Sequence, residues 1–415
     1  MSEMADVTLD SLLATISQEQ RDKIAKEISS KIRSELYPVR IEKMELVLTE
    51  RCNFACHYCF LGNHGQGRDM SAEVAEEAIK YCLDRLPEGR DLCIVLFGGE
   101  PLMALPLIKH IVEFVKVTAK PGQKVMYDCT SNGSLITEEV AHYLAENGIK
   151  VLLSLDGKDE AHDLHRCFRD GSPTFNAVMA GFQNLRKYQS WVGARVTFSP
   201  ETVHCLADDI IWLNQNGFCQ FIIGIASGVE WPEEKLALIE PQMLKLAEYY
   251  RDIHVEGRLP LRITDFEDGL DALEKRHTGL WGCGAARSTV SVIPDGTIYP
   301  CSRFSSLFNC KGAYPCGNVK DGVANFAALH DLQDGRGLVR YPCYRCEYSN
   351  LCSGSCPAVN LEAMDSIYVT DPVSCAFVKV KIELHKQMPD LHRVHIDYPM
   401  MHAARAEHEA AMKAE

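Results

Sequence analysis

The sequence predicts an α/β fold, a partial (β/α)6 barrel followed by a C-terminal cysteine-rich domain. Between residues 43 and 230, short apolar segments alternate with amphipathic ones, as in repeated β/α units around a parallel sheet. Twelve of the eighteen cysteines fall into two dense groups, one just after the first predicted strand and one beyond residue 281. The second group lies in a segment rich in Cys, Gly, Pro and Tyr, which has little aliphatic surface to bury and is expected to need metal to fold.

The predicted strands are short and apolar, and helices separate them. Met44, Leu46 and Leu48 alternate with other residues, as expected for a strand. Ser71 and Thr137 stand where they would cap helices, and chemistry in such sheets lies at the carboxyl ends of the strands. The six predicted strands cover residues 44–48, 91–97, 125–130, 151–155, 194–198 and 221–225, and the helices cover residues 71–86, 105–115, 137–148, 175–185 and 206–213.

Changes in composition divide the chain into five predicted parts. Apolar residues at helical spacing precede the barrel, and a second helical stretch follows it. The end of the chain is rich in Ala, Glu and His. The parts are an N-terminal helical segment (residues 1–42), the barrel (43–230), a helical bridge (231–280), the cysteine-rich domain (281–380) and a C-terminal helical tail (381–415).

The formal net charge of −14 disfavours a nucleic-acid-binding protein, because phosphate contacts need clustered Lys and Arg. Residues 1–10 show no signal-peptide pattern, and no run of about 18 apolar residues predicts a membrane span. We therefore expect a cytoplasmic protein without a membrane partner. Thiols stay reduced there, so the cysteines are expected to bind metal or to pack rather than form disulfides. Six isolated cysteines are predicted to pack: Cys82, Cys93, Cys129, Cys167, Cys205 and Cys219.

The first cysteine group is a C-x3-C-x2-C motif formed by Cys52, Cys56 and Cys59. Three thiolates can hold a cubane cluster by three of its irons and leave the fourth iron open to a substrate or cofactor. A structural zinc site is the alternative, but it needs four ligands, and His57 is the residue that could complete it.

This motif and the segments after it resemble the radical S-adenosylmethionine (SAM) superfamily. Tyr58 is the aromatic residue that such enzymes place before the third cysteine, and Gly98-Gly99-Glu100-Pro101 resembles the segment that binds the amino group of SAM. Glycines let the backbone approach a ligand, and a carboxylate can pair with an ammonium. The resemblance further implies that Asn132 lines the SAM pocket and that Ser154 and Arg166 contact the ribose or carboxylate of SAM.

A structural alternative remains for two of these segments, because Asn132-Gly133 and Asp156-Gly157 are also ordinary turn sequences. The resemblance implies a cluster that donates one electron to SAM, releasing methionine and a 5′-deoxyadenosyl radical that abstracts a hydrogen atom. An electron donor such as flavodoxin or ferredoxin is implied as a partner. Asp156, His162 and Asp265 are candidate catalytic residues, and each also suits a structural role.

The second cysteine group resembles, position for position, the seven-cysteine SPASM domain of radical SAM enzymes that modify peptides and proteins. A zinc ribbon is the alternative. The resemblance implies two auxiliary clusters and therefore three [4Fe–4S] clusters in all. By that resemblance Cys343, Cys346, Cys352 and Cys375 hold the outer auxiliary cluster, and Cys283, Cys301 and Cys356 hold the inner one.

The inner auxiliary cluster is then one protein ligand short. In some relatives the open iron is free for a substrate thiolate, whereas Cys310 and Cys316 lie close in this sequence and could close the site instead. The residues alone leave both readings open.

Two groups of SPASM relatives imply different reactions. Sulfatase maturases oxidise Cys or Ser to formylglycine and carry an aspartate base directly after the cysteine equivalent to Cys301, where this chain has Ser302. Peptide maturases form thioether or carbon–carbon crosslinks, and they resemble this chain at Gly282–Arg287 and Gly296–Phe304. We therefore expect a radical SAM oxidoreductase that crosslinks a ribosomally made precursor peptide. Sulfatase maturation and a non-catalytic iron–sulfur protein are the alternatives.

Many peptide maturases carry an N-terminal winged-helix domain that recognises the leader of the precursor peptide. Residues 1–42 are too few for such a domain. A separate leader-recognition protein is therefore a possible partner.

Overall fold

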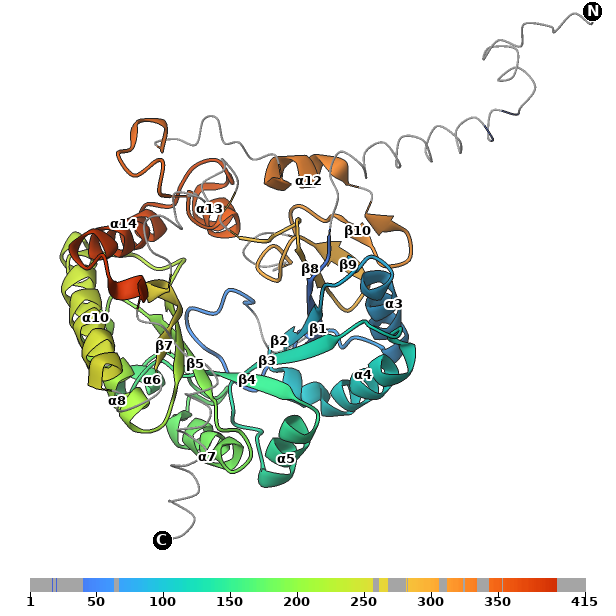
Figure 1. The fold of residues 1–415 in the computed structure, drawn as a ribbon, viewed down its shortest axis with the longest axis horizontal. Helices are drawn as coiled ribbons and strands as arrows, with labels where there is room; N and C mark the ends of the chain where they lie inside the picture. The colour runs from blue at the N-terminus through green and yellow to red at the C-terminus, as the bar shows by residue number, and fades with distance from the viewer. Residues whose placement is uncertain are drawn as a thin grey trace, which may run out of the picture.

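The computed structural model describes residues 40–62, 67–256, 261–267, 281, 283–305, 312–323, 325–333, 343–352 and 354–393, together with residues 17 and 20. Within them an eleven-stranded sheet curves into an open barrel with helices around its outer side (Figure 1). The strands are β1 Lys43–Thr49, β2 Leu92–Gly98, β3 Val125–Ser131, β4 Ile149–Ser154, β5 Gly193–Phe198, β6 Gln220–Ile225, β7 Arg262–Ile263, β8 Thr289–Val292, β9 Thr297–Tyr299, β10 Gly317–Asn318 and β11 Gly322–Val323. The α-helices are α3 Ala72–Leu83, α4 Leu105–Thr118, α5 Glu138–Glu146, α6 Asp159–Asp163, α7 Phe175–Arg186, α8 Leu206–Gln215, α9 Glu233–Leu236, α10 Ile239–Glu256, α12 Phe326–Gln333, α13 Pro357–Met364 and α14 Pro372–Gln387. Short 3-10 helices are η1 Pro101–Ala104, η2 Val203–Cys205, η3 Thr264–Phe266, η4 Cys343–Arg345 and η5 Leu391–Arg393.

Strands β1 to β7 follow one another across the sheet in chain order, and each pair is parallel. Strand β8 adds to the other edge of β1, also in parallel, and β9 to β11 continue the sheet in antiparallel pairs. The predicted α/β fold with a parallel sheet is confirmed. Each of the six predicted strands lies within two residues of its predicted limits.

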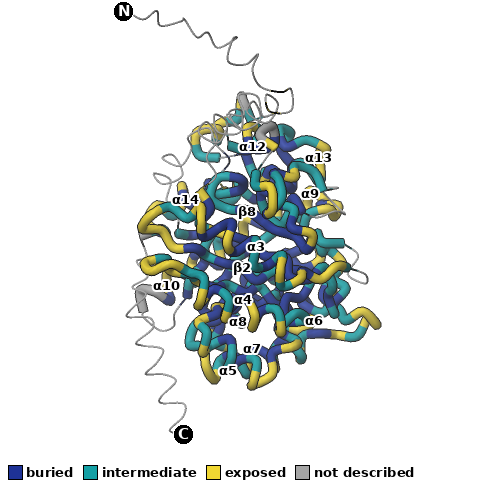
Figure 2. Tube along the Cα trace, turned by 90° about the vertical axis from the view of Figure 1, so that its right-hand side faces the viewer, coloured by how far each residue is buried: buried dark blue, intermediate teal, exposed yellow. Residues whose placement is uncertain are grey.

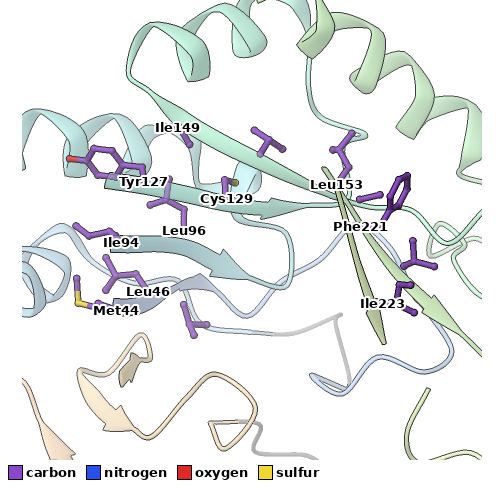
Figure 3. Packing of buried hydrophobic residues seen from close by; sticks show 14 of the residues in the cluster. Met44, Leu46, Ile94, Leu96, Tyr127, Cys129, Ile149, Leu153, Phe221 and Ile223 are labelled. Carbon is purple, nitrogen blue, oxygen red and sulfur yellow. The ribbon is translucent and has the colours of Figure 1, made fainter. Parts of the chain in front are cut away.

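The apolar core lies between the sheet and its helices. Alternate residues of β1, namely Met44, Leu46 and Leu48, are fully buried there, and they pack with the equivalent residues of β2 to β6 (Figure 3). The opposite face of these strands is more polar. Lys43, Asp128 and Lys150 are among the residues that line a cavity of about 580 Å³. Most buried residues lie on the strands and on the helix faces turned toward them, and most exposed residues lie on the outer sides of the helices and in loops (Figure 2).

The helix limits have local causes that the sequence predicted. The Ser71 hydroxyl accepts from the Val74 N–H at 3.3 Å and begins α3, and the Thr137 hydroxyl begins α5 in the same way. Gly148, at φ 65°, follows the end of α5, because this left-handed conformation suits glycine.

The sheet crosses the predicted domain boundaries at residues 230 and 280. Strand β7 lies within the predicted helical bridge, and β8 to β11 lie within the predicted cysteine-rich domain. Ile263 and Val292 are fully buried, so these short strands contribute to the same core as the barrel. Helix α14 crosses the boundary at residue 380, and its Phe377 ring packs 5.4 Å from the ring of Phe198 on β5. The first half of the cysteine-rich domain is thus built onto the barrel.

The predicted N-terminal helical segment lies outside the described residues except for residues 17, 20 and 40–42, and the predicted tail lies outside them beyond residue 393. Helices α9 and α10 lie within the predicted bridge. Among the described residues, no helix has the length and apolar character needed to cross a membrane.

Candidate functional site

The first cysteine group lies on the loop that follows β1. Cys52 is buried, and Cys56 and Cys59 are partly buried. Burial raises the pKa of the Cys52 thiol to about 12 and that of Cys56 to about 11, and the three thiols interact electrostatically. Such thiols are neutral unless a positive charge compensates them, which a metal centre would do. The loop therefore has the donor chemistry of a metal site.

The number of these thiols suits an iron–sulfur cluster. Three thiolates can hold a [4Fe–4S] cluster, each on a different iron, and leave the fourth iron open. Cys52, Cys56 and Cys59 supply three thiols on one loop.

Two glycines hold the end of β2 against the cysteine loop. The Gly99 N–H donates to the Thr49 carbonyl at 2.9 Å, and the Glu100 N–H donates to the Arg51 carbonyl at 2.9 Å. A Cβ atom on Gly98 would lie 2.3 Å from the Thr49 oxygen, and one on Gly99 would lie 2.3 Å from the Arg51 oxygen. The Gly-Gly pair is thus required by the contact between two backbones, in addition to any approach of a ligand.

Glu100 is fully buried at the end of β2, and its carboxylate accepts three hydrogen bonds. One oxygen accepts from the Leu102 N–H at 3.0 Å and the Ser131 hydroxyl at 2.9 Å, and the other accepts from the Asn132 N–H at 2.7 Å. Burial raises the pKa of Glu100 to about 7 against these donors. A carboxylate has about four acceptor positions, so one position remains for a ligand. Pro101, also buried, begins η1 next to it.

Asn132 links the end of β3 to the cysteine loop. Its Nδ2 donates to Asn53 Oδ1 at 2.8 Å and lies 3.9 Å from the sulfur of Cys52. Its Oδ1 accepts from the Ser134 N–H at 3.0 Å. The predicted pocket residue is therefore beside the first cysteine.

Asp156, Arg166 and Tyr58 form a buried polar network beside the same loop. The Arg166 Nε and Nη2 donate to the two oxygens of Asp156 at 2.9 and 3.0 Å, with 8% and 2% of the two side chains exposed. The Tyr58 hydroxyl donates to Asp156, which also accepts from the Thr197 N–H at 2.8 Å. Ser154, on the last position of β4, pairs with Arg195 in the sheet. Arginine has five donors, so this ion pair leaves some of them for a ligand.

The catalytic candidates His162 and Asp156 have structural partners. His162 is fully buried, its Nε2 lies 3.0 Å from the Thr174 hydroxyl, and burial lowers its pKa to about 4. Asp156 is held by Arg166, as described above. These contacts favour the structural role for both residues. The third candidate, Asp265, accepts from Lys381 at 3.0 Å, and its other oxygen is buried without a hydrogen-bond partner in the described chain.

The second cysteine group separates into two sets. Burial raises the pKa of the Cys301 thiol, which interacts with Cys356 and Cys283. Burial also raises the pKa of the Cys375 thiol on α14, which interacts with Cys352, Cys343 and Cys346. The two groups of interacting thiols contain the residues expected for the inner and outer auxiliary clusters, and their assignment to clusters stays a prediction. Cys283 and Cys356 are exposed, so the inner set is open to solvent in the described structure.

Of the two candidate extra ligands, Cys316 lies within the described residues. Cys316 is 1% exposed, lies in the apolar core, and has its sulfur 3.6 Å from the Tyr314 carbonyl. This position favours packing. Cys310 lies outside the described residues. Among the isolated cysteines, Cys82 and Cys129 are fully buried in the core, as expected for packing residues.

Two polar residues of this region have no role in the sequence-based prediction. Glu45 on β1 accepts from the Ser302 N–H at 2.6 Å, next to Cys301. Arg303 donates to Glu362 on α13 and to Ser227 beyond β6. Strand alternation alone would have placed Glu45 on the polar face of β1, whereas no sequence signal links Arg303 to its distant partners.

Comparison with known proteins shows that the barrel, including its cysteine loop, is similar to one family. Residues 46–213 match the Radical SAM superfamily. The chain is 23% identical over 400 residues to the radical SAM cyclopropyl synthase TigE of Paramaledivibacter caminithermalis, covering 86% of this chain and 77% of that protein. It is 25% identical over 326 residues to a cysteine-type anaerobic sulfatase-maturating enzyme of Clostridium perfringens, covering 74% and 85%. The fold resembles native anSMEcpe with bound AdoMet and Cp18Cys peptide, with a TM-score of 0.69, 22% identity and coverage of 85% and 98%.

Proposed function

Residues 46–213 form a radical SAM domain, and from that premise we propose that this enzyme installs a thioether or carbon–carbon crosslink in a ribosomally made peptide. The observation that carries the proposal is the inner cysteine set, Cys283, Cys301 and Cys356. These three thiols would hold a cluster by three of its irons, and the exposure of Cys283 and Cys356 supports access of a substrate thiolate to the fourth iron. The name of one relative, cyclopropyl synthase, is consistent with carbon–carbon bond formation.

Cys52, Cys56 and Cys59 would hold the first [4Fe–4S] cluster. When SAM is bound to it, this cluster supplies the electron that releases the 5′-deoxyadenosyl radical. Glu100 offers its remaining acceptor position to the SAM ammonium, while Asn132 and Tyr58 line the pocket. Ser154 and the free donors of Arg166 bind the ribose or carboxylate. The barrel around them keeps water from the reacting atoms.

Four further thiols, Cys343, Cys346, Cys352 and Cys375, would hold the outer auxiliary cluster, which completes three clusters. Alanine substitution of Cys283, Cys301 and Cys356 together is expected to remove about four irons per chain, because one whole cluster is lost. The same variant is expected to keep SAM cleavage but to lose peptide modification.

The reaction is tested with anaerobically reconstituted enzyme, SAM, a reductant and the precursor peptide encoded next to its gene. A crosslink removes two hydrogen atoms from the peptide, which mass spectrometry detects together with 5′-deoxyadenosine. A peptide of unchanged mass in the presence of SAM cleavage would contradict the proposal.

Sulfatase maturation is the second candidate, since Glu45 places a carboxylate beside Cys301 where Ser302 replaces the usual aspartate. Formylglycine carries an aldehyde, which a crosslink lacks. Labelling of a sulfatase-motif peptide by an aldehyde-reactive hydroxylamine would select this candidate, and labelling that disappears in Glu45→Gln would identify its base.

The affinity for SAM is expected to rise with pH through about 7. Glu100 must be ionised to pair with an ammonium, and its pKa of about 7 lies above the ordinary value of 4.5 because the residue is buried. The affinity falls again near pH 8, where an α-amino group loses its proton. For the same reason the folded state favours protonated Glu100, so its contribution to stability is largest below pH 4.5 and declines as the pH rises to 7.

Equilibrium binding of SAM between pH 5.5 and 8.5 measures this profile. Glu100→Gln is expected to bind weakly without the rising limb, whereas Glu113→Gln, on an exposed side chain, should retain the full profile. A pH-independent affinity of the unmodified enzyme would argue against contact between Glu100 and SAM.

A further inference from the structure

Arg303 connects three elements at the mouth of the barrel. Its Nε donates to Glu362 on α13 at 3.2 Å, and its Nη2 donates to Glu362 and to Ser227 beyond β6. Its guanidinium also lies 5.0 Å from the centre of the Phe60 ring. Phe60 directly follows Cys59, and its ring stacks 6.4 Å from that of Phe97.

The same residue belongs to the loop of the inner cysteine set. Arg303 is two residues from Cys301, and helix α13, which carries its partner Glu362, begins directly after Cys356. The two thiols lie close enough to interact electrostatically. A continuous path therefore runs from Cys59 through Phe60 and Arg303 to Cys301, with one cation–π contact as its non-covalent step.

The positive charge of Arg303 lies close to the first cysteine group. Its guanidinium is 5.0 Å from the centre of the Phe60 ring, and Phe60 directly follows Cys59 in the chain. The side chains of Arg303 and Glu362 are 22% and 9% exposed, so solvent screens their charges only in part. A charge in this position acts on any group that binds Cys59.

We propose that Arg303 is a positioning residue that fastens the loop of the first cluster to the loop of the inner cysteine set and raises the reduction potential of that first cluster. Reduction adds one negative charge to the cluster, and a nearby positive charge stabilises the reduced state. The carboxylate of Glu362 holds the guanidinium in place and offsets part of its effect. The inference depends on the radical SAM domain and not on the crosslinking reaction. A negative result for crosslinking would therefore not contradict the role of Arg303, and a negative result for Arg303 would not contradict crosslinking.

The test compares the midpoint potential of the first cluster in Arg303→Met, Arg303→Lys and Glu362→Gln. The full-length protein is reconstituted with iron and sulfide and titrated with dithionite under EPR, and the first cluster is the signal that changes when SAM is added. Arg303→Met is expected to shift the potential to more negative values and Glu362→Gln to more positive ones. Arg303→Lys should leave the potential nearly unchanged, because it retains the positive charge.

Arg90→Met is the matched control, because Arg90 pairs with Glu42 before β2, at the end of the strands away from the cysteine loop. It should leave the potential unchanged. Shifts of the midpoint potential in the same direction in Arg303→Met and Glu362→Gln, or no shift in either variant, would overturn the proposal. Arg303 would then have only a structural role. If Arg303→Met fails to take up iron, the other two variants still decide the question, because the proposal requires a more positive potential in Glu362→Gln and a nearly unchanged potential in Arg303→Lys.

Discussion

Replacing Asp156 by Ala is expected to lower the free energy of unfolding of the iron-free protein by about 3–5 kcal/mol, because it leaves the buried charge of Arg166 without its partner. The two residues form a bidentate ion pair, and 8% of the Arg166 side chain and 2% of the Asp156 side chain are exposed. The substitution also removes the acceptor of the Tyr58 hydroxyl and of the Thr197 N–H. Denaturant unfolding of the apo-protein, followed by circular dichroism, measures the loss.

An exposed ion pair provides the control for this experiment. Asp84 accepts from Lys120 at 2.9 Å, with 61% and 66% of the side chains exposed, and Asp84→Ala is expected to cost about 0–1 kcal/mol. The double variant Asp156→Leu/Arg166→Met should be more stable than Asp156→Ala, because it removes both buried charges. A loss for Asp156→Ala no larger than that for Asp84→Ala would show that water reaches Arg166 and compensates its charge.

The barrel strands were predictable because their signal is local. An apolar segment bounded by turn residues, with alternate side chains buried against helices, identifies β1 without reference to any distant residue. Strands β7 and β8, which lie beyond the predicted end of the barrel, lack such a signal. Strand β7 is two residues long and β8 is four, and each is stabilised by a neighbour far away in the chain. Tertiary pairing, which the sequence pattern does not encode locally, decides these strands.

The candidate site also contains residues that a local sequence pattern predicts and residues that it does not. The first cysteine group was predicted as a cluster site from its spacing, since Cys52, Cys56 and Cys59 are close together on one loop. Cys356 and Cys301 are far apart in sequence, and only the resemblance to a known domain placed them together. Arg303 and Glu362 carry no such resemblance, and their pairing depends on how α13 packs over the barrel. The pairing of Arg303 with Glu362 could be identified only from the structure.

Replacing Gly99 by Ala is expected to remove the first cluster and to abolish SAM cleavage. The added Cβ atom would lie 2.3 Å from the Arg51 oxygen and 3.0 Å from the Cβ of Cys52. Both neighbours belong to the cysteine loop, and the first is backbone, so no change of side-chain rotamer relieves the contact. Reconstituted Gly99→Ala should hold about four fewer irons per chain than the unmodified protein, since one cubane is lost. An iron assay and chromatography of 5′-deoxyadenosine measure the two effects.

The iron content of Gly99→Ala distinguishes between two roles for this glycine, the approach of SAM and the contact of β2 with the cysteine loop. If the glycine only lets SAM approach the backbone, Gly99→Ala keeps its full iron and loses SAM binding. If the glycine lets β2 contact the cysteine loop, as the hydrogen bond from the Glu100 N–H to the Arg51 carbonyl indicates, the cluster is lost first. Gly193→Ala is the control, because its added Cβ atom would meet the flexible end of Leu152 at 3.0 Å and would stay 3.3 Å from the nearest backbone atom, the Gln220 oxygen. That variant should retain its iron, and full iron in both variants would assign Gly99 to the ligand alone.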